Sequence, residues 1–198
     1  MGQKIVIFTD ADNTLWDTNK IYEDAQLALL KDVEQASGSV GPSKKRLDFL
    51  REYDQAIAAS HHAGLRYPPR LLCQVLALGL QGENPKSAFR RVWSGAEKKE
   101  FLPTGTIEKI EIRFVERLSQ KPQLRKGVRD GLNWLKERHF PVLVVTEGVK
   151  KKVLNLISFY DLTDLVDRVI EGRKEPSLYK RIIRLIDDPE KVIMIGDQ

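Results

Sequence analysis

The 198-residue sequence has little sulfur and no long apolar run, since it contains one cysteine and two methionines. The single cysteine, Cys73, excludes an internal disulfide, and its place in the apolar stretch "RLLCQVLALGL" predicts a small buried side chain. A reducing, cytoplasmic location is therefore expected. No stretch approaches the roughly 20 apolar residues of a membrane span, and the opening "MGQKIVIF" lacks the pattern of a signal peptide. We therefore expect neither a membrane segment nor a secretory signal.

The sequence also lacks a strong excess of one charge. Its 33 Lys and Arg against 28 Asp and Glu give a formal charge of +5, which favours anionic ligands only mildly. The basic runs at 44–46 and 150–152 are too short to predict nucleic acid binding. Two adjacent histidines, His61 and His62, suggest a metal, but neighbouring side chains on a helix point about 100° apart. We therefore do not expect this pair to be a metal site.

Four short apolar runs predict β-strands, at 5–8, 142–145, 168–170 and 192–195, the third being the weakest. Helical patterns separate the later runs, and Pro176 suits the first turn of the last of these helices. Alternation of strand and helix is typical of a parallel sheet covered by helices on both faces. The chain, 41% hydrophobic, is long enough for one sizeable core and an appended module. The fold class is therefore α/β, with a Rossmann-like, doubly wound parallel sheet.

Residues 19–120 differ from the rest, because they show helical periodicity and almost no strand. Asn84-Pro85 predicts the start of one helix, and Thr106 is predicted to cap another. We interpret 19–120 as an all-helical domain inserted into an α/β domain that comprises 1–18 and 121–198.

Polar residues follow the predicted strands at their carboxyl ends, where ligands bind in doubly wound sheets. Two carboxylates close together favour a cation between them, and oxygen ligands of this kind suit Mg²⁺. A carboxylate is also a nucleophile toward phosphorus, and a lysine can neutralise the charge that develops there. A hydroxyl and free backbone N–H groups at a helix start can bind an anion. The residues concerned are Asp10 and Asp12 after the first strand, Thr146 and Gly148 after the second, Lys174 near the last helix, and Asp197 after the last strand.

The order of these residues resembles the haloacid dehalogenase (HAD) superfamily of hydrolases. Its first motif, Asp-x-Asp-x-Thr-Leu after an apolar strand, is matched by 10–15, "DADNTL". Its second motif, a Thr or Ser that closes an apolar strand, is matched by Thr146 in "VLVVTEG". Its third, a lysine before a helix that begins with proline, is matched by Lys174 in "GRKEPSLY", and its fourth by Gly196-Asp197. The helical insertion after the first motif resembles the C1-type cap of that family.

This resemblance implies a Mg²⁺-dependent phosphatase that acts on a small phosphorylated substrate. Asp10 would be the nucleophile that forms an aspartyl-phosphate, and Asp12 would be the general acid and base. The phosphoryl group would be bound by Thr146, Glu147, Gly148 and Lys174. The metal would be held by Asp10, by the backbone carbonyl of Asp12 and by Asp197.

The resemblance is incomplete at the end of the sequence. In the family a second acidic residue usually follows Gly-Asp, and a further helix and strand complete the sheet, whereas this sequence stops at Gln198. We expect strand 192–195 to be an exposed edge, which invites self-association. The sequence is either a fragment, which we favour, or a shortened relative that needs a partner along that edge. The alternative functions are a catalytically silent binding or regulatory module, a phosphomutase, or another hydrolase of the HAD superfamily. Trp16, directly after the first motif, either touches substrate or packs in the core.

Overall fold

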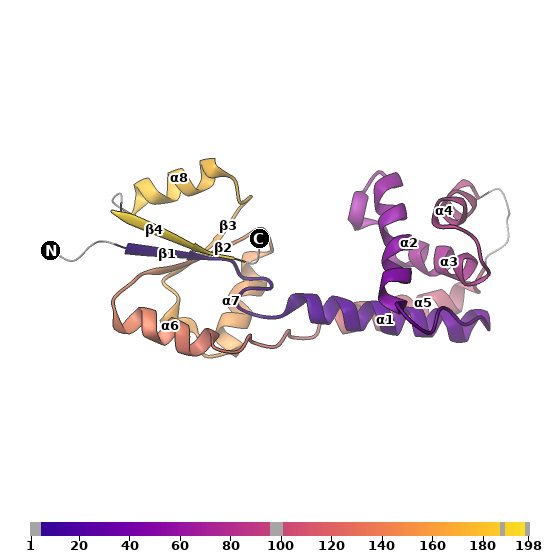
Figure 1. Cartoon of the computed structure of the whole chain (residues 1–198), viewed down its shortest axis with the longest axis horizontal. Helices are drawn as coiled ribbons and strands as arrows, with labels where there is room; N and C mark the ends of the chain where they lie inside the picture. Colours follow the sequence, from indigo (N-terminus) through magenta and orange to yellow (C-terminus); the bar gives the residue numbers. More distant parts are fainter. Residues whose placement is uncertain (1–4, 96–100, 187–188, 197–198) are drawn as a thin grey trace. The chain divides into compact units, whose positions relative to one another are not determined.

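The computed structural model describes residues 5–95, 101–186 and 189–196 (Figure 1). The chain divides into two compact units, Met1–Asn19 with Lys121–Gln198, and Lys20–Gln120. We call them the sheet unit and the helical unit. No helix in the described part of the chain is long and apolar enough to cross a membrane.

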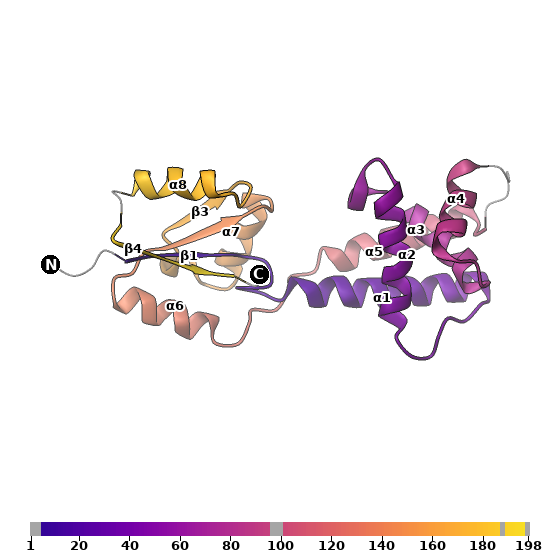
Figure 2. The same ribbon diagram turned by 45° about the horizontal axis from the view of Figure 1, so that its top comes forward.

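The sheet unit contains four parallel strands in the order β3-β2-β1-β4. The α/β prediction is therefore confirmed. Figure 2 shows α6 and α8 on opposite sides of the sheet. The elements of this unit are β1 (Ile5–Thr9), α6 (Val128–Glu137), β2 (Val142–Thr146), α7 (Lys150–Phe159), η2 (Thr163–Leu165), β3 (Arg168–Glu171), α8 (Pro176–Leu185) and β4 (Lys191–Ile195).

The central strands are buried on both faces, as their uninterrupted apolar sequences predict. Alternate residues of a strand point to opposite faces. Ile7 of β1 accordingly packs in one cluster with Leu132 of α6 and Val153 of α7. Its neighbour Phe8 packs in a second cluster with Ile182 of α8. Both faces of β1 are therefore covered, and the polar residues that follow the strand are held on a rigid element.

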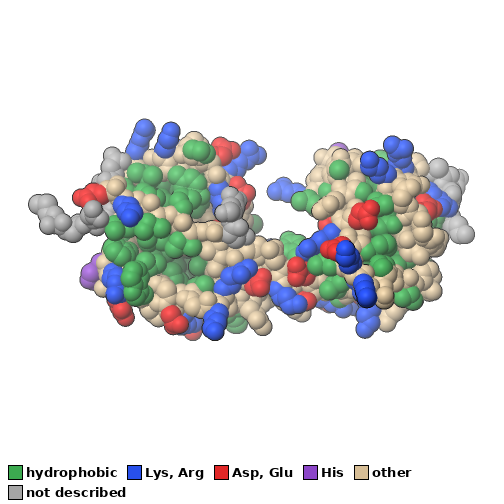
Figure 3. All heavy atoms as spheres, viewed as in Figure 1, with side chains coloured by type: hydrophobic (Ala, Val, Ile, Leu, Met, Phe, Trp, Pro, Cys, Tyr) green, Lys and Arg blue, Asp and Glu red, His purple; other side chains and the backbone are tan. Residues whose placement is uncertain are grey.

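The fourth strand lies beside β1, with Ile7 paired to Ile193 and Thr9 to Ile195. Within the described residues β4 has no second strand neighbour. Ile193, Met194 and Ile195 remain 37%, 57% and 45% exposed. Figure 3 shows hydrophobic side chains gathered on the visible face of this unit. The exposed edge is as the sequence predicts, and self-association through it stays a prediction.

The helical unit has its own core, in which Cys73 is fully buried. Burial, and secondarily the charge of Glu111, raises the pKa of the Cys73 thiol to about 12, so the cysteine acts as a small hydrophobic residue. The predicted cap at Asn84 is confirmed, because its side chain accepts a hydrogen bond from the Ser87 N–H at 3.0 Å. The helices are α1 (Thr18–Ser37), which begins in the sheet unit, α2 (Arg46–Ser60), η1 (Gly64–Arg66), α3 (Pro69–Leu80), α4 (Pro85–Ser94) and α5 (Thr104–Leu118).

Two local predictions for this unit are wrong. Thr106 does not cap a helix, because α5 begins at Thr104 and the Pro103 carbonyl accepts the first hydrogen bonds, from the N–H groups of residues 106 and 107. His61 and His62 do not lie on a helix, because α2 ends at Ser60, and their rings stack with centroids 4.3 Å apart instead of diverging. Burial lowers the pKa of His61, and the neighbouring His62 adds to the effect. The pair is part of an aromatic cluster with Trp93.

Candidate active site

The candidate site lies where β1 and β4 end side by side. The backbone N–H of Asp10 donates to the carbonyl of Ile195 at 2.9 Å, which holds the first residue after β1 against the end of β4. Strands β1, β2 and β3 follow one another toward one edge of the sheet, whereas β4 lies on the other side of β1. Ligands of doubly wound folds bind where the strand order reverses in this way. The fold therefore presents Asp10 at the position where a ligand is expected.

The carboxylate of Asp10 is fixed through both of its oxygens. Oδ1 accepts a hydrogen bond from the Ala11 N–H at 2.6 Å, and Oδ2 forms an ion pair with Nζ of Lys174. Lys174 comes from the loop between β3 and α8, and 12% of the Asp10 side chain is exposed to solvent. Two residues that are distant in the sequence therefore meet, and the ammonium group of Lys174 pairs with the carboxylate of Asp10.

The second carboxylate, Asp12, is oriented by two neutral donors. The indole Nε1–H of Trp16 donates to Oδ1 at 3.1 Å, and the hydroxyl of Thr18 donates to the same oxygen at 2.8 Å. Trp16 is completely buried, so of its two expected roles the structure supports core packing. With Oδ1 occupied twice, Oδ2 is the oxygen of Asp12 that is left to meet a ligand.

Thr146, the last residue of β2, and Gly148, in the loop that follows, lie close to Asp12. Thr146 is buried, and its Oγ1 accepts a hydrogen bond from the Gly148 N–H at 3.0 Å. A Cβ atom at Gly148 would lie 3.2 Å from Thr146 Oγ1 and 3.6 Å from Asp12 Oδ2. The first of these distances is too short for an ordinary contact. Glycine at this position therefore leaves room for the threonine hydroxyl and the aspartate to converge.

Glu147 holds the loop that carries Lys174. Its Oε1 accepts a hydrogen bond from the backbone N–H of Lys174 at 3.0 Å, although the two residues are 27 positions apart. A carboxylate repels a phosphate, so this contact accounts for an acidic residue beside an anion site better than direct phosphate binding by the side chain does. The sequence contains no signal for this long-range contact.

A hollow of about 290 Å³ opens beside Asp10 and Lys174 within the sheet unit. Tyr179, from the first turns of α8, lines it and packs edge-on against Phe8. Burial raises the pKa of the Tyr179 hydroxyl, while the charge of Lys174 opposes that rise. Tyr179 is a site residue that the motifs do not include. The other lining residues are Thr9, Val145, Met194, Ile195 and Gly196.

The charges at the site are suited to a cation. Asp10, Asp12 and Glu147 place acidic side chains at the site and Lys174 a basic one, so acidic groups outnumber basic ones. The donors to Asp12 that the structure gives, Trp16 and Thr18, are neutral. Carboxylate oxygens without sulfur or imidazole are the donor type that Mg²⁺ prefers. Among the described residues no three His, Cys, Asp or Glu side chains form a metal cluster, and the third predicted ligand, Asp197, lies outside those residues.

Comparison with known proteins identifies the family of the chain. The chain matches the haloacid dehalogenase-like hydrolase family over residues 5–198. It is 26% identical to a glyceraldehyde 3-phosphate phosphatase from Pyrococcus furiosus over 200 residues, which cover 98% of this chain and 72% of that protein. It is also similar in fold to a haloacid dehalogenase-like hydrolase from Xanthomonas campestris, with a TM-score of 0.61 and 20% identity over 100% of this chain and 76% of the other.

A further solved structure, the HAD-hydrolase YfnB from Bacillus subtilis bound to magnesium, aligns with a TM-score of 0.51 and 13% identity. The alignment covers 100% of this chain and 81% of that one. At this identity the likeness concerns the fold alone. The family match spans both the strand that precedes Asp10 and the loop that carries Lys174. The chain therefore belongs to the haloacid dehalogenase-like hydrolase family.

Proposed function

We propose that this hydrolase is a Mg²⁺-dependent phosphatase that acts through an aspartyl-phosphate on Asp10. The observation that carries the proposal is the carboxylate of Asp10, fixed at the end of β1 by Ala11 and paired with Lys174. A carboxylate held in one position can attack phosphorus without first being oriented, and the neighbouring cation stabilises the negative charge of the phosphoryl group.

In the first step a carboxylate oxygen of Asp10 attacks the phosphorus atom, and the bond from phosphorus to the ester oxygen breaks. The ester oxygen leaves with a proton that Asp12 donates through Oδ2, while Trp16 and Thr18 hold the other oxygen in place. General acid catalysis of this kind is worth about 10²–10⁴-fold in rate. The product alcohol departs, and the phosphoryl group remains on Asp10 as an acyl phosphate.

In the second step Asp12, now ionised, removes a proton from water, and that water attacks the phosphorus atom. The acyl phosphate bond breaks, which releases inorganic phosphate and restores both aspartates. Mg²⁺, held by Asp10, the backbone carbonyl of Asp12 and Asp197, would supply positive charge to the phosphoryl oxygens. The side chains of Lys174 and Thr146 and the backbone N–H of Glu147 would bind the same oxygens, whereas the Gly148 N–H already donates to Thr146 Oγ1.

The substrate we propose is a small phosphomonoester. Glyceraldehyde 3-phosphate is the first compound to test, because the Pyrococcus furiosus relative is named for it. We further propose that the helical unit, which interrupts the sheet unit between β1 and β2, acts as a cap that selects the substrate. Loops and inserted segments commonly carry specificity while the core carries the chemistry.

Phosphate release tests the proposal directly. Purified protein is expected to hydrolyse p-nitrophenyl phosphate, acetyl phosphate or glyceraldehyde 3-phosphate in Mg²⁺, and to lose that activity in excess EDTA and regain it when Mg²⁺ is restored. Inorganic phosphate is measured colorimetrically. Binding of a phosphorylated ligand without release would favour a silent binding module, and activity that survives EDTA would contradict the metal dependence. Transfer of the phosphoryl group to a second hydroxyl of the same compound, instead of to water, would identify a mutase.

Glu147 provides a test of how Lys174 is positioned. Glu147→Ala removes the acceptor of the Lys174 N–H bond, so kcat/KM is expected to fall by about 10-fold, in line with the loss of one charge-assisted hydrogen bond. Glu147→Gln keeps an acceptor oxygen and is expected to recover most of the activity. The matched control is Glu171→Ala, because Glu171 accepts from the Lys150 N–H at 2.7 Å but holds no site residue. Equal losses in the Glu147 and Glu171 alanine variants would contradict a specific role for Glu147.

A further inference from the structure

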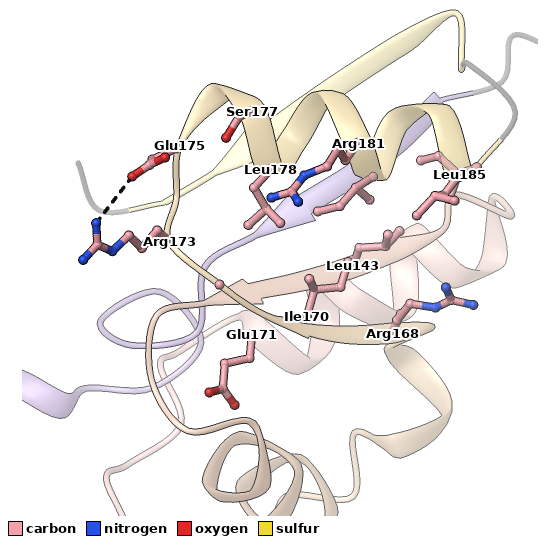
Figure 4. Close-up of a pocket in the computed structure, with 13 residues that line it drawn as sticks. Leu143, Arg168, Ile170, Glu171, Arg173, Glu175, Ser177, Leu178, Arg181 and Leu185 are labelled. Carbon is pink, nitrogen blue, oxygen red and sulfur yellow. Dashed lines mark ion pairs between the residues drawn. The ribbon is translucent and has the colours of Figure 1, made fainter.

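A groove of about 640 Å³ runs between α8 and the part of the sheet formed by β2 and β3 (Figure 4). Its volume lies in the range of small-molecule sites, which is about 300–1,000 Å³. Neither Asp10, Asp12, Thr146 nor Lys174 lines it, so it is a different surface from the candidate active site.

The interior of the groove is apolar. Leu143 of β2 and Ile170 of β3 line the side of the groove formed by the sheet, and Leu178 and Leu185 line the opposite side, formed by α8 (Figure 4). Leu185 is 78% exposed, which is high for a leucine on the sheet side of an amphipathic helix. An apolar molecule in the groove would therefore gain contact area that the protein leaves uncovered.

The charges of the groove do not cancel. Arg173 pairs with Glu175 at one end, at 3.9 Å. The carboxylate of Glu171 accepts from the Lys150 N–H, and Figure 4 shows it turned away from the apolar residues. Arg168 and Arg181 remain, and within residues 5–95, 101–186 and 189–196 neither guanidinium has a carboxylate partner. Arg168 and Arg181 thus border an apolar surface without a paired carboxylate among those residues, and the three arginines and two glutamates that line the groove give it a net charge of +1.

We propose that this groove binds a small amphipathic anion, a molecule with an apolar body and a carboxylate or sulfonate head. The body lies against Leu143, Ile170 and Leu185, and the head meets Arg181 or Arg168. Guanidinium groups bind oxyanion heads through paired hydrogen bonds to two of their oxygens. A free phosphate or a sugar phosphate has no apolar body and does not satisfy the site. The proposal is independent of the phosphatase function.

Two dyes with the same apolar body test the proposal on the full chain. The anion is 8-anilinonaphthalene-1-sulfonate, and its neutral counterpart is N-phenyl-1-naphthylamine. Fluorescence titration is expected to show one site that binds the sulfonate at least about 10-fold more tightly than the neutral dye, since only the sulfonate can accept charge-assisted hydrogen bonds from a guanidinium group. Decanoate is expected to displace the sulfonate dye, and inorganic phosphate is not.

Paired charge variants locate the site. Arg168→Gln with Arg181→Gln is expected to weaken sulfonate binding by at least about 10-fold. Lys180→Gln with Arg184→Gln removes the same charge from exposed positions of α8 that do not line the groove, and is expected to change affinity by less than about twofold. Melting curves establish that both double variants fold.

If both double variants weaken sulfonate binding equally, the effect reflects the net charge of the protein and not the groove. If neither double variant weakens binding, the dye binds elsewhere, for example on the exposed side of β4. Equal affinity for the two dyes would show that the head plays no part. Sedimentation that reveals a dimer, dissociated by the Arg168 and Arg181 changes, would assign the groove to a second copy of the chain. Each of these results overturns the proposal.

Discussion

Replacing Asp10 by asparagine is expected to lower phosphatase turnover by at least about 10³-fold, because an amide oxygen is a poor nucleophile toward phosphorus. Asparagine has nearly the same shape as aspartate, and its side-chain oxygen can still accept the hydrogen bond from the Ala11 N–H. The change therefore removes the charge and the nucleophile and leaves the turn in place. Turnover is measured as release of p-nitrophenol in Mg²⁺.

Stability and a matched variant separate chemistry from folding. The pair between Lys174 and Asp10 is partly exposed, at 21% and 12% for the two side chains, so we expect Asp10→Asn to shift Tm by no more than about 5 °C. Asp161→Asn is the control, because Asp161 is exposed and has a φ of 51°, a left-handed conformation that asparagine tolerates. It is expected to keep full activity. An Asp10→Asn variant with more than about 1% of wild-type activity would exclude Asp10 as the nucleophile.

The two central strands could be predicted from the sequence because they are buried on both faces. Such strands appear as uninterrupted apolar runs, and the structure contains them at β1 and β2 within a residue of the predicted limits. The apolar run at β4 was predicted as closely, although most of its residues are exposed. The prediction for β3 was weaker because only Val169 is fully buried in a strand whose ends are exposed. The end of the first apolar run also predicted the place of Asp10, since parallel strands end at one edge of a sheet, whereas Lys174 was predicted from its place before a helix that begins with proline.

The contacts that orient the site could not be predicted. Trp16 and Thr18 both donate to one oxygen of Asp12, and that depends on the turn at Asn13, which has a φ of 57°. The bond from the Lys174 N–H to Glu147 joins two loops that meet only in the folded sheet. Stacking of His61 on its neighbour was missed because the pattern did not reveal where α2 ends. Motif spacing predicts which residues meet and gives no information on which of their atoms face each other.

Replacing Asp12 is expected to have the second large effect, and a diagnostic one. The proposed mechanism requires Asp12 twice, as an acid when the alcohol leaves and as a base when water attacks. Acetyl phosphate has a leaving group that needs little protonation, so an Asp12→Asn variant should still phosphorylate Asp10 from it and then fail to hydrolyse the product. Steady-state turnover is expected to fall by about 10²–10⁴-fold while a phosphorylated protein accumulates.

Asparagine is the informative substitution because its oxygen can still accept the hydrogen bonds from Trp16 and Thr18. Asp12→Ala removes that acceptor and leaves the buried indole N–H without a partner, so it is expected to lose stability as well as activity, by about 1–3 kcal/mol. Mass spectrometry of the intact Asp12→Asn protein after exposure to acetyl phosphate should show the added mass of one phosphoryl group, which hydroxylamine removes. The same treatment of a variant that also carries Asp10→Asn should add nothing. A label that persists in that double variant would place the covalent phosphate on another residue, and wild-type turnover in Asp12→Asn would exclude Asp12 as the acid and base.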